Sequence, residues 1–264
     1  MHMTKQENKI TLLENQSSLE FLPRLTEYLN GPKIYIKRDD EGGRSGGGNK
    51  LRKYERIIGE AISKNCDTLI IAGHYQSNAA RALVGSACQL GLKSIVVCKE
   101  LIPQQNESFL HNGNALLMNI MGAHIVSIKP QDDFMASMEK IAKDIETKGG
   151  KPYIIPFGGS NLLGALGYVD CIEEIIEQSK EKSIDFPDYI FTAIGSGGTQ
   201  SGLLAGIKKN KLESKVIGIS VLHKKDIAER IVSDLTFETL KFLSIETESK
   251  DNINIDDNFI GGGY

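Results

Sequence analysis

Short runs of apolar, β-branched residues alternate along the chain with longer segments in which apolar residues recur every three or four positions. Runs with the length and composition of strands lie at 33–38, 67–73, 94–99, 124–129, 152–157, 189–195 and 215–222. Several of them lack the polar alternation of a half-exposed strand. This indicates strands that are covered by helices on both faces.

The segments between these runs have a helical period. The clearest covers 50–64, where Leu51, Tyr54, Ile57, Ile58 and Ala61 fall on one face. Helices are also expected at 77–90, 107–121, 132–148, 164–181, 199–208 and 225–243, and the polar stretch 246–258 is expected to be a surface excursion.

Repeated strand–helix–strand units with right-handed crossovers predict an α/β fold with open, mostly parallel, twisted sheets flanked by helices. A closed eight-fold barrel is the weaker alternative, because eight clean repeats are not present.

Composition narrows the kind of partner. The chain has 264 residues and a net charge of −3, with no basic stripe of the kind that binds nucleic acid. No apolar run reaches the 18 or so residues that a membrane span needs, and the first residues lack the apolar core of a signal peptide. We therefore expect a cytoplasmic protein that binds a small molecule, with no nucleic acid and no membrane as partner.

The cysteines form no pattern typical of a metal site. Cys66, Cys88, Cys98 and Cys171 include no C-x-x-C pair, so zinc is not expected. Cys88 and Cys98 lie in apolar runs and are expected to be small buried side chains.

Small polar turns follow three of the predicted strands. These are "HYQSN" at 74–78, "GGSN" at 158–161 and "SGGTQSG" at 196–202. In open parallel sheets, ligands bind at the carboxyl ends of the strands, where helices begin. The three turns are therefore the candidate binding residues.

The turn "GSGGTQSG" at 195–202 has the composition of a phosphate-binding loop. Glycines let the backbone approach a ligand, and amide groups at a helix start attract an anion. It is not the dinucleotide motif, because Gln200 stands where G-x-G-x-x-G requires glycine. The alternative is a flexible turn without a ligand.

The stretch "SGGGNKLRK" at 45–53 places a lysine after a glycine run but fails the P-loop pattern, because Asn49 stands where the lysine is required. Lys50 is either an exposed lysine in a first helical turn or an amine whose protonated form the helix dipole disfavours. The second case lowers the pKa of the amine and favours a nucleophile that forms a Schiff base.

In "HYQSN", Ser77 and Asn78 are helix-cap residues that either only cap or also bind a ligand. His74 is a candidate general base, with a structural role as the alternative. Ser77 lacks the G-x-S-x-G surroundings of a serine hydrolase.

Five blocks together resemble one known family. They are "IKRDD" (36–40), "GGNKLRKYE" (47–55), "QSN" (76–78), "GGSNLLGALGYVD" (158–170) and "IGSGGTQSG" (194–202). They are similar, in order, to the D-cysteine desulfhydrases and 1-aminocyclopropane-1-carboxylate deaminases, which are pyridoxal-phosphate enzymes related to tryptophan synthase β. The blocks at 36–40 and 158–170 look more like the desulfhydrase branch.

The resemblance implies pyridoxal 5′-phosphate as cofactor and assigns residues to it. Lys50 would form the Schiff base with the cofactor, and Asn78 would hydrogen-bond the pyridine 3′-oxygen. The cofactor phosphate would be held by Lys53 together with Ser196, Gly197, Gly198 and Thr199.

The resemblance also implies the chemistry, an α,β-elimination that converts D-cysteine to pyruvate, ammonia and hydrogen sulfide. Lys50 or Ser77 would remove the α-proton of the small amino-acid substrate, Ser77, Asn78 and Ala79 would contact it, and Tyr264 would approach it. The substrate alternative is 1-aminocyclopropane-1-carboxylate. Alternatives to this enzyme class are a non-catalytic binding protein on the same fold and, more remotely, a nucleotide-using enzyme.

The resemblance further implies a homodimer whose cofactor cleft lies between two domains. We expect residues 1–48 and 158–264 to form the larger cofactor domain, C-terminally incomplete, and residues 49–157 to form the smaller one.

Two departures from the family pattern bear on activity. Ala79 replaces a common histidine, and His74-Tyr75 replace smaller apolar residues, so we expect an altered substrate fit. Family members also continue several dozen residues beyond the position of Tyr264. We therefore expect weak or no turnover from a chain that ends there.

Overall fold

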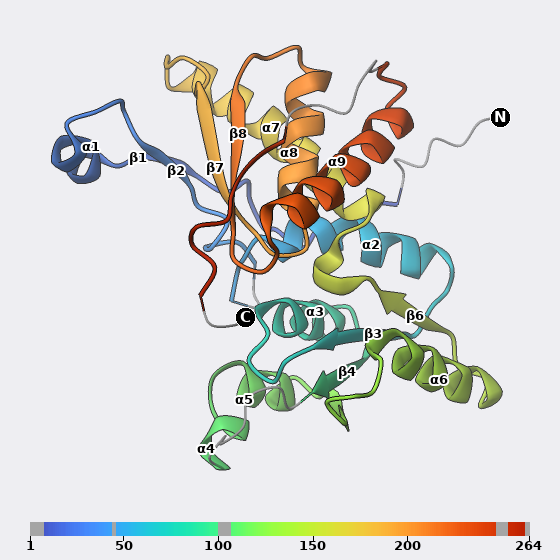
Figure 1. Cartoon of the computed structure of the whole chain (residues 1–264). Coiled ribbons are helices and arrows are strands. Elements are labelled where there is room, and N and C mark those ends of the chain that lie inside the picture. Colours follow the sequence, from blue (N-terminus) through green and yellow to red (C-terminus); the bar gives the residue numbers. More distant parts are fainter. Residues whose placement is uncertain (1–7, 44–45, 100–106, 247–252, 262–264) are drawn as a thin grey trace.

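The computed structural model describes residues 8–43, 46–99, 107–246 and 253–261. Figure 1 shows two parallel sheets at opposite ends of the molecule, with α2 lying between them. The elements in chain order are β1 (Leu19–Phe21), α1 (Pro23–Leu29), β2 (Tyr35–Lys37), α2 (Lys50–Ser63), β3 (Thr68–Gly73), α3 (Asn78–Gln89), β4 (Lys93–Lys99), α4 (Glu107–Leu110), α5 (Gly113–Ile120), β5 (His124–Ile128), α6 (Phe134–Thr147), β6 (Pro152–Ile155), a 3-10 turn (Phe157–Gly159), α7 (Leu162–Glu181), β7 (Tyr189–Ile194), α8 (Gly198–Lys209), β8 (Lys215–Ser220), α9 (Lys225–Phe242) and β9 (Asn254–Asp256).

The first sheet has the order β5-β4-β3-β6, with all neighbours parallel. Successive side chains of a strand point to opposite faces. Leu69 and Ile71 accordingly pack with α2 and α3, while Ile70 and Ala72 pack with Met138 of α6. All six residues of β3 are buried. The absence of polar alternation thus correctly indicated strands covered on both faces.

The second sheet has the order β7-β8-β9, again parallel. Its core is formed by side chains of α7 and α8 around Val216 of β8. Strand β9 corrects one prediction, because residues 254–256 belong to the sheet rather than to a surface excursion. Ile253 and Ile255 are buried and pack with α9. The two apolar residues, Ile253 and Ile255, were too few in this polar stretch to indicate a strand from the sequence.

The run at 33–38 forms a strand outside both parallel sheets. Strand β2 pairs antiparallel with β1, and this ribbon carries the short helix α1 to one side of the molecule (Figure 1). The helix expected at 107–121 is divided into α4 and α5 around Gly113, whose φ is +51°. The predicted fold class is confirmed: parallel sheets are flanked by helices. The two-domain assignment of residues stays a prediction.

Side-chain caps explain where several helices begin. The side chains of Ser77, Asp133 and Asn161 accept hydrogen bonds from Ala80 N, Ala136 N and Gly164 N at the starts of α3, α6 and α7. Among the helices of the described residues, none combines the length and the apolar character needed to cross a membrane.

The cysteine expectation is half right. Cys98 is fully buried on β4, whereas Cys88 is exposed. Cys88 lies in the last turn of α3, whose buried face is formed by Leu83, Val84 and Ala87. Within the described residues, no group of three His, Cys, Asp or Glu side chains is placed to hold a metal ion.

Candidate active site

A cavity of about 620 Å³ lies between the two parallel sheets. It is lined by the carboxyl ends of β3 and β7 and by the starts of α2, α3 and α8. The structure brings together there most of the predicted site residues, which are Lys50, Lys53, Ser77, Asn78, Ala79, Ser196, Gly197 and Thr199. Gly198 begins α8 beside them. Tyr264 lies outside the described residues.

Lys50 is the first residue of α2, directly after Asn49. Its Nζ atom donates a hydrogen bond to Asn49 Oδ1 at 2.9 Å. Burial lowers the pKa of this amine, as expected for an ammonium group removed from water. No carboxylate of the described residues forms an ion pair with it. The amine is therefore biased toward its neutral, nucleophilic form.

The glycine run before Lys50 is required by close backbone packing. A Cβ atom on Gly47, whose φ is +65°, would lie 1.8 Å from the carbonyl oxygen of Asp40. The next glycine, Gly48, has a φ of +108° and donates its N–H to the carbonyl oxygen of Asp39 at 2.9 Å. This turn determines where α2 begins, and so where Lys50 lies.

Lys53 is 1% exposed and lies one turn further along α2. Its Nζ atom donates to Gly158 O at 3.3 Å and to Ser160 Oγ at 3.2 Å. Burial first, and then the charge of Lys50, lower its pKa well below the usual value. A buried ammonium without a carboxylate partner is costly, and among the described residues none is paired with Lys53. The position therefore favours a bound anion.

The start of α8 lies beside this lysine. Gly197, with a φ of +82°, precedes the helix, and the N–H of Gly198 donates to Ser160 Oγ at 3.1 Å. The hydroxyls of Ser160 and Ser196 are hydrogen-bonded at 2.7 Å. A Cβ atom on Gly198 would lie 3.0 Å from Lys53 Nζ. Amides, hydroxyls and a buried amine thus surround one small space, which suits a phosphate group.

Ser160 belongs to the turn 158–161 that the sequence indicated as candidate binding residues, but no individual role was predicted for it or for Asn49. Ser160 links Lys53, Ser196 and Gly198 through its single hydroxyl. Asn49 donates from Nδ2 to Thr199 Oγ1 at 3.1 Å while its Oδ1 accepts from Lys50. A role for Ser160 could have been predicted from its position in the turn after β6, because Ser77 occupies the corresponding turn after β3.

The start of α3 forms the opposite side of the cavity. Ser77 caps the helix by accepting from Ala80 N at 3.2 Å, and Asn78 Oδ1 accepts from Asn114 Nδ2 at 2.9 Å. Gln76 ties this turn to α5, because its Oε1 accepts from Asn114 N at 2.8 Å. Asn114 had no sequence signal. The capping role of Ser77 is confirmed, and the residue also lines the cavity.

Residues 10–252 match the family described as "Pyridoxal-phosphate dependent enzyme". The chain belongs to this family. Its cofactor is pyridoxal 5′-phosphate, and the cavity of this pyridoxal-phosphate-dependent enzyme fits that group. It offers a buried amine at Lys50 for the aldehyde, and it offers the second amine, Lys53, beside the start of α8 for the phosphate.

Curated relatives of this pyridoxal-phosphate-dependent enzyme include D-cysteine desulfhydrases. That of Serratia proteamaculans is 39% identical over 216 residues, which cover 82% of this chain and 65% of the relative. That of Klebsiella pneumoniae is 35% identical over 256 residues, which cover 97% of this chain and 76% of the relative. The chain thus spans about two thirds to three quarters of the curated relatives it matches.

Solved structures agree with this assignment. The crystal structure of an ACC deaminase homologue has 32% identity and a TM-score of 0.85, and the match covers 98% of this chain and 78% of that one. A pyridoxal 5′-phosphate-dependent aspartate racemase matches with 20% identity and a TM-score of 0.62 over 83% of this chain and 61% of that one, which supports the fold alone. The family resemblance inferred from the sequence blocks is confirmed.

Proposed function

We propose that this pyridoxal-phosphate-dependent enzyme acts on D-cysteine. The reaction consumes one D-cysteine and one water and releases pyruvate, ammonia and hydrogen sulfide. The observation that carries the proposal is a buried amine, Lys50, inside a cavity of a chain that is 35% identical over 97% of its length to a D-cysteine desulfhydrase.

The residues that line the cavity form two groups, one for the aldehyde and ring of the cofactor and one for its phosphate. Lys50 would supply the amine that bonds to the cofactor aldehyde, and Asn78 would hydrogen-bond the pyridine 3′-oxygen. Lys53 with Ser196, Gly197, Gly198 and Thr199 would hold the phosphate. The hydrogen bonds of Ser160 to Lys53 Nζ and Gly198 N support this role, because they orient both donors toward one space. When bound, the cofactor supplies an electron sink that acidifies the α-carbon of an amino acid.

Lys50 and Ser77 carry the proton transfers. The lowered pKa of Lys50 favours its neutral amine, which is the form that can take the α-proton. Ser77 Oγ and the first amides of α3, next to Asn78 and Ala79, face the substrate carboxylate. A helix of this length presents a partial positive charge to that carboxylate. The sulfur then leaves as thiolate, and hydrolysis by one water releases pyruvate and ammonia.

A second candidate substrate is 1-aminocyclopropane-1-carboxylate. The similarity to an ACC deaminase homologue at 32% identity supports it. Its product would be 2-oxobutanoate in place of pyruvate. Ala79 lines the cavity and presents only a methyl group there.

The test uses the purified chain with added pyridoxal phosphate. We expect a visible absorption band that is absent in Lys50→Ala and present in Lys64→Ala, a control at the exposed far end of α2. Release of pyruvate and sulfide from D-cysteine, against 2-oxobutanoate from 1-aminocyclopropane-1-carboxylate, identifies the substrate. A band that survives in Lys50→Ala would contradict the role of Lys50, and release of 2-oxobutanoate without pyruvate would contradict D-cysteine as the substrate.

We also propose a cytoplasmic homodimer with the domain limits given above. The family resemblance supports this assembly. Sedimentation of the purified chain at micromolar concentration tests it, with a monomer as the contradicting result.

A further inference from the structure

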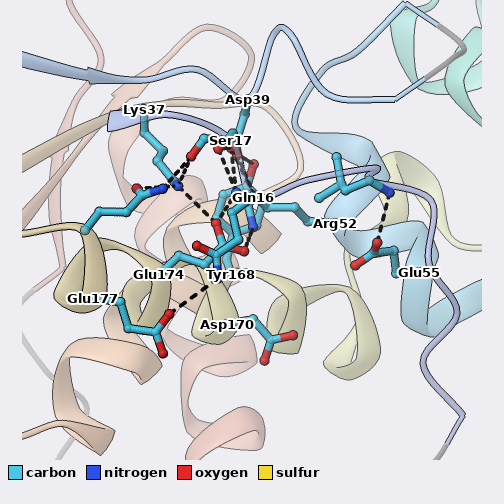
Figure 2. A network of polar contacts seen from close by, with 12 residues as sticks. Gln16, Ser17, Lys37, Asp39, Arg52, Glu55, Tyr168, Asp170, Glu174 and Glu177 are labelled. Carbon is cyan, nitrogen blue, oxygen red and sulfur yellow. Dashed lines mark hydrogen bonds and ion pairs between the residues drawn. The ribbon is translucent and has the colours of Figure 1, made fainter. Parts of the chain in front are cut away.

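A buried ion-pair network joins the chain after β2 to α2 and α7 (Figure 2). Arg52, which is 3% exposed, donates from Nε to both carboxylate oxygens of Asp39 at 3.0 Å. Its other two nitrogens donate to the two carboxylate oxygens of Glu174 on α7, at 2.7 and 2.8 Å. One guanidinium therefore holds the chain after β2, the first turn of α2 and the middle of α7 together.

The charges of this network balance. Lys37 of β2 forms an ion pair with Glu174 at 3.0 Å, so two cations face two carboxylates. Burial alone would raise the pKa of Asp39 and of Glu174, but the charge and hydrogen bonds of Arg52 hold both below their usual values. Both acids are thus ionised at neutral pH. None of these four residues lines the cavity.

Tyr168 connects the network to the site. It is 4% exposed on α7, and its single O–H proton is shared between two acceptors, Asp39 Oδ2 at 2.8 Å and, more weakly, Asn49 O at 3.3 Å. Burial first, and then the charge of Asp39, raise its pKa well above the usual value, so the hydroxyl stays protonated. The carbonyl of Asp39 also accepts from Gly48 N. Asp39 and Tyr168 therefore hold the backbone on both sides of the Gly48–Asn49 peptide bond.

The side chain of Asn49 faces the other way, into the cavity. Its Oδ1 accepts from Lys50 Nζ at 2.9 Å, and its Nδ2 donates to Thr199 Oγ1 at 3.1 Å. We infer that Tyr168 is a positioning residue for Lys50. Its hydroxyl, which Asp39 orients, fixes the backbone of Asn49. The side chain of Asn49 in turn holds the Lys50 amine where it is buried away from water. The inference rests on the proposed role of Lys50 as the cofactor-binding amine.

The test compares Tyr168→Phe with Tyr153→Phe. Tyr153 is a matched control, because its hydroxyl also donates to a carboxylate, that of Glu60, which lies near the end of α2 farthest from Lys50. The readout is the pH dependence of amine acylation at Lys50 in the protein without cofactor, followed by mass spectrometry of the peptide. We expect the midpoint to move upward in Tyr168→Phe, toward an ordinary lysine, because a loosened turn admits water to the amine.

A shift of about one pH unit corresponds to about tenfold less neutral amine at a fixed lower pH. The rate at which added pyridoxal phosphate develops its visible band should fall by the same factor in Tyr168→Phe and not in Tyr153→Phe. Asn49→Ala should shift the midpoint in the same direction, and Tyr168→Phe should add little in the Asn49→Ala background.

An unshifted midpoint in Tyr168→Phe, with or without a lower melting temperature, would overturn the inference. If Tyr168→Phe does not fold, an unshifted midpoint in Asn49→Ala would overturn it equally. The acylation experiment uses neither cofactor nor D-cysteine, so a failure of the proposed reaction leaves its result intact.

Discussion

Lys53 Nζ lies 3.2 Å from Ser160 Oγ, and the same hydroxyl accepts from the first amide of α8. This arrangement joins a residue of α2 to the turn after β6 and to the start of a third element. A space is left that is rich in donors and lacks a carboxylate among the described residues. The stability and the cofactor affinity of the protein should both depend on this buried amine.

Lys53→Met should have opposite effects on stability and on cofactor binding. Removing a buried amine that lacks a counter-charge should raise the free energy of unfolding of the cofactor-free protein by about 1 kcal/mol or leave it unchanged. Affinity for pyridoxal phosphate should fall at least about tenfold, because a charged hydrogen bond to phosphate is lost. Urea denaturation and a fluorescence titration measure the two effects. The exposed Lys64→Met should change neither, and equal losses of stability and affinity would contradict the prediction.

The cofactor-free protein should gain stability as the pH rises from neutral toward 10. The pKa of Lys53 is lower in the folded protein than in the unfolded chain. Between these two values the unfolded chain binds one more proton, so the free energy of unfolding rises with pH, by at most about 1.4 kcal/mol per pH unit for this group. Lys53→Met should lack this contribution. Parallel stability profiles for the two proteins would contradict it.

Local patterns predicted the parts of the fold that depend on neighbours in sequence. The uniformly apolar run of β3 and the helical face around Tyr54 each identified an element and its buried side. The turns after β3, β6 and β7 were predicted to form the site because ligands bind at the carboxyl ends of parallel strands. The first two turns follow strands of one sheet and the third follows a strand of the other. Contacts between distant segments could not be predicted, such as the hydrogen bond from Tyr168 to Asp39, because nothing in the local composition specifies which side chains meet.

Strand β9 and Asn114 illustrate the same limit. Strand β9 consists of three residues, and only its pairing with β8 and the burial of Ile255 define it. Asn114 contacts the α3 start because α5 packs beside it, while the residue itself lies in an unremarkable polar position. The strand β9 and the contact of Asn114 both depend on pairing and packing between distant segments, and not on local propensity.

Gly198→Ala should impair cofactor binding without preventing folding. A Cβ atom there would lie 2.5 Å from Ser160 Oγ and 3.0 Å from Lys53 Nζ. Both neighbours are side-chain ends that can move away, so the helix should still form while the donors separate. We expect at least about tenfold weaker binding of pyridoxal phosphate, equivalent to about 1.4 kcal/mol, in an absorption titration. Gly31→Ala, whose Cβ would make only an ordinary contact at 3.7 Å, is the control. Unchanged affinity in Gly198→Ala would contradict the assignment.

Arg52→Met should destabilise the protein more than any change at a surface ion pair. It leaves the carboxylates of Asp39 and Glu174 buried without their guanidinium, which typically costs about 3–5 kcal/mol. Lys209→Met removes a more exposed partner of Glu173 and should cost less than about 1 kcal/mol.

The wild-type network also makes the free energy of unfolding depend on pH. Both acids have lowered pKa values when folded, so their contribution is present above about pH 4 and is lost as the pH falls through those lowered values. Chemical denaturation at pH 7 and pH 3 measures both effects. An Arg52→Met variant as stable as Lys209→Met would show that the network does not hold α2 against α7.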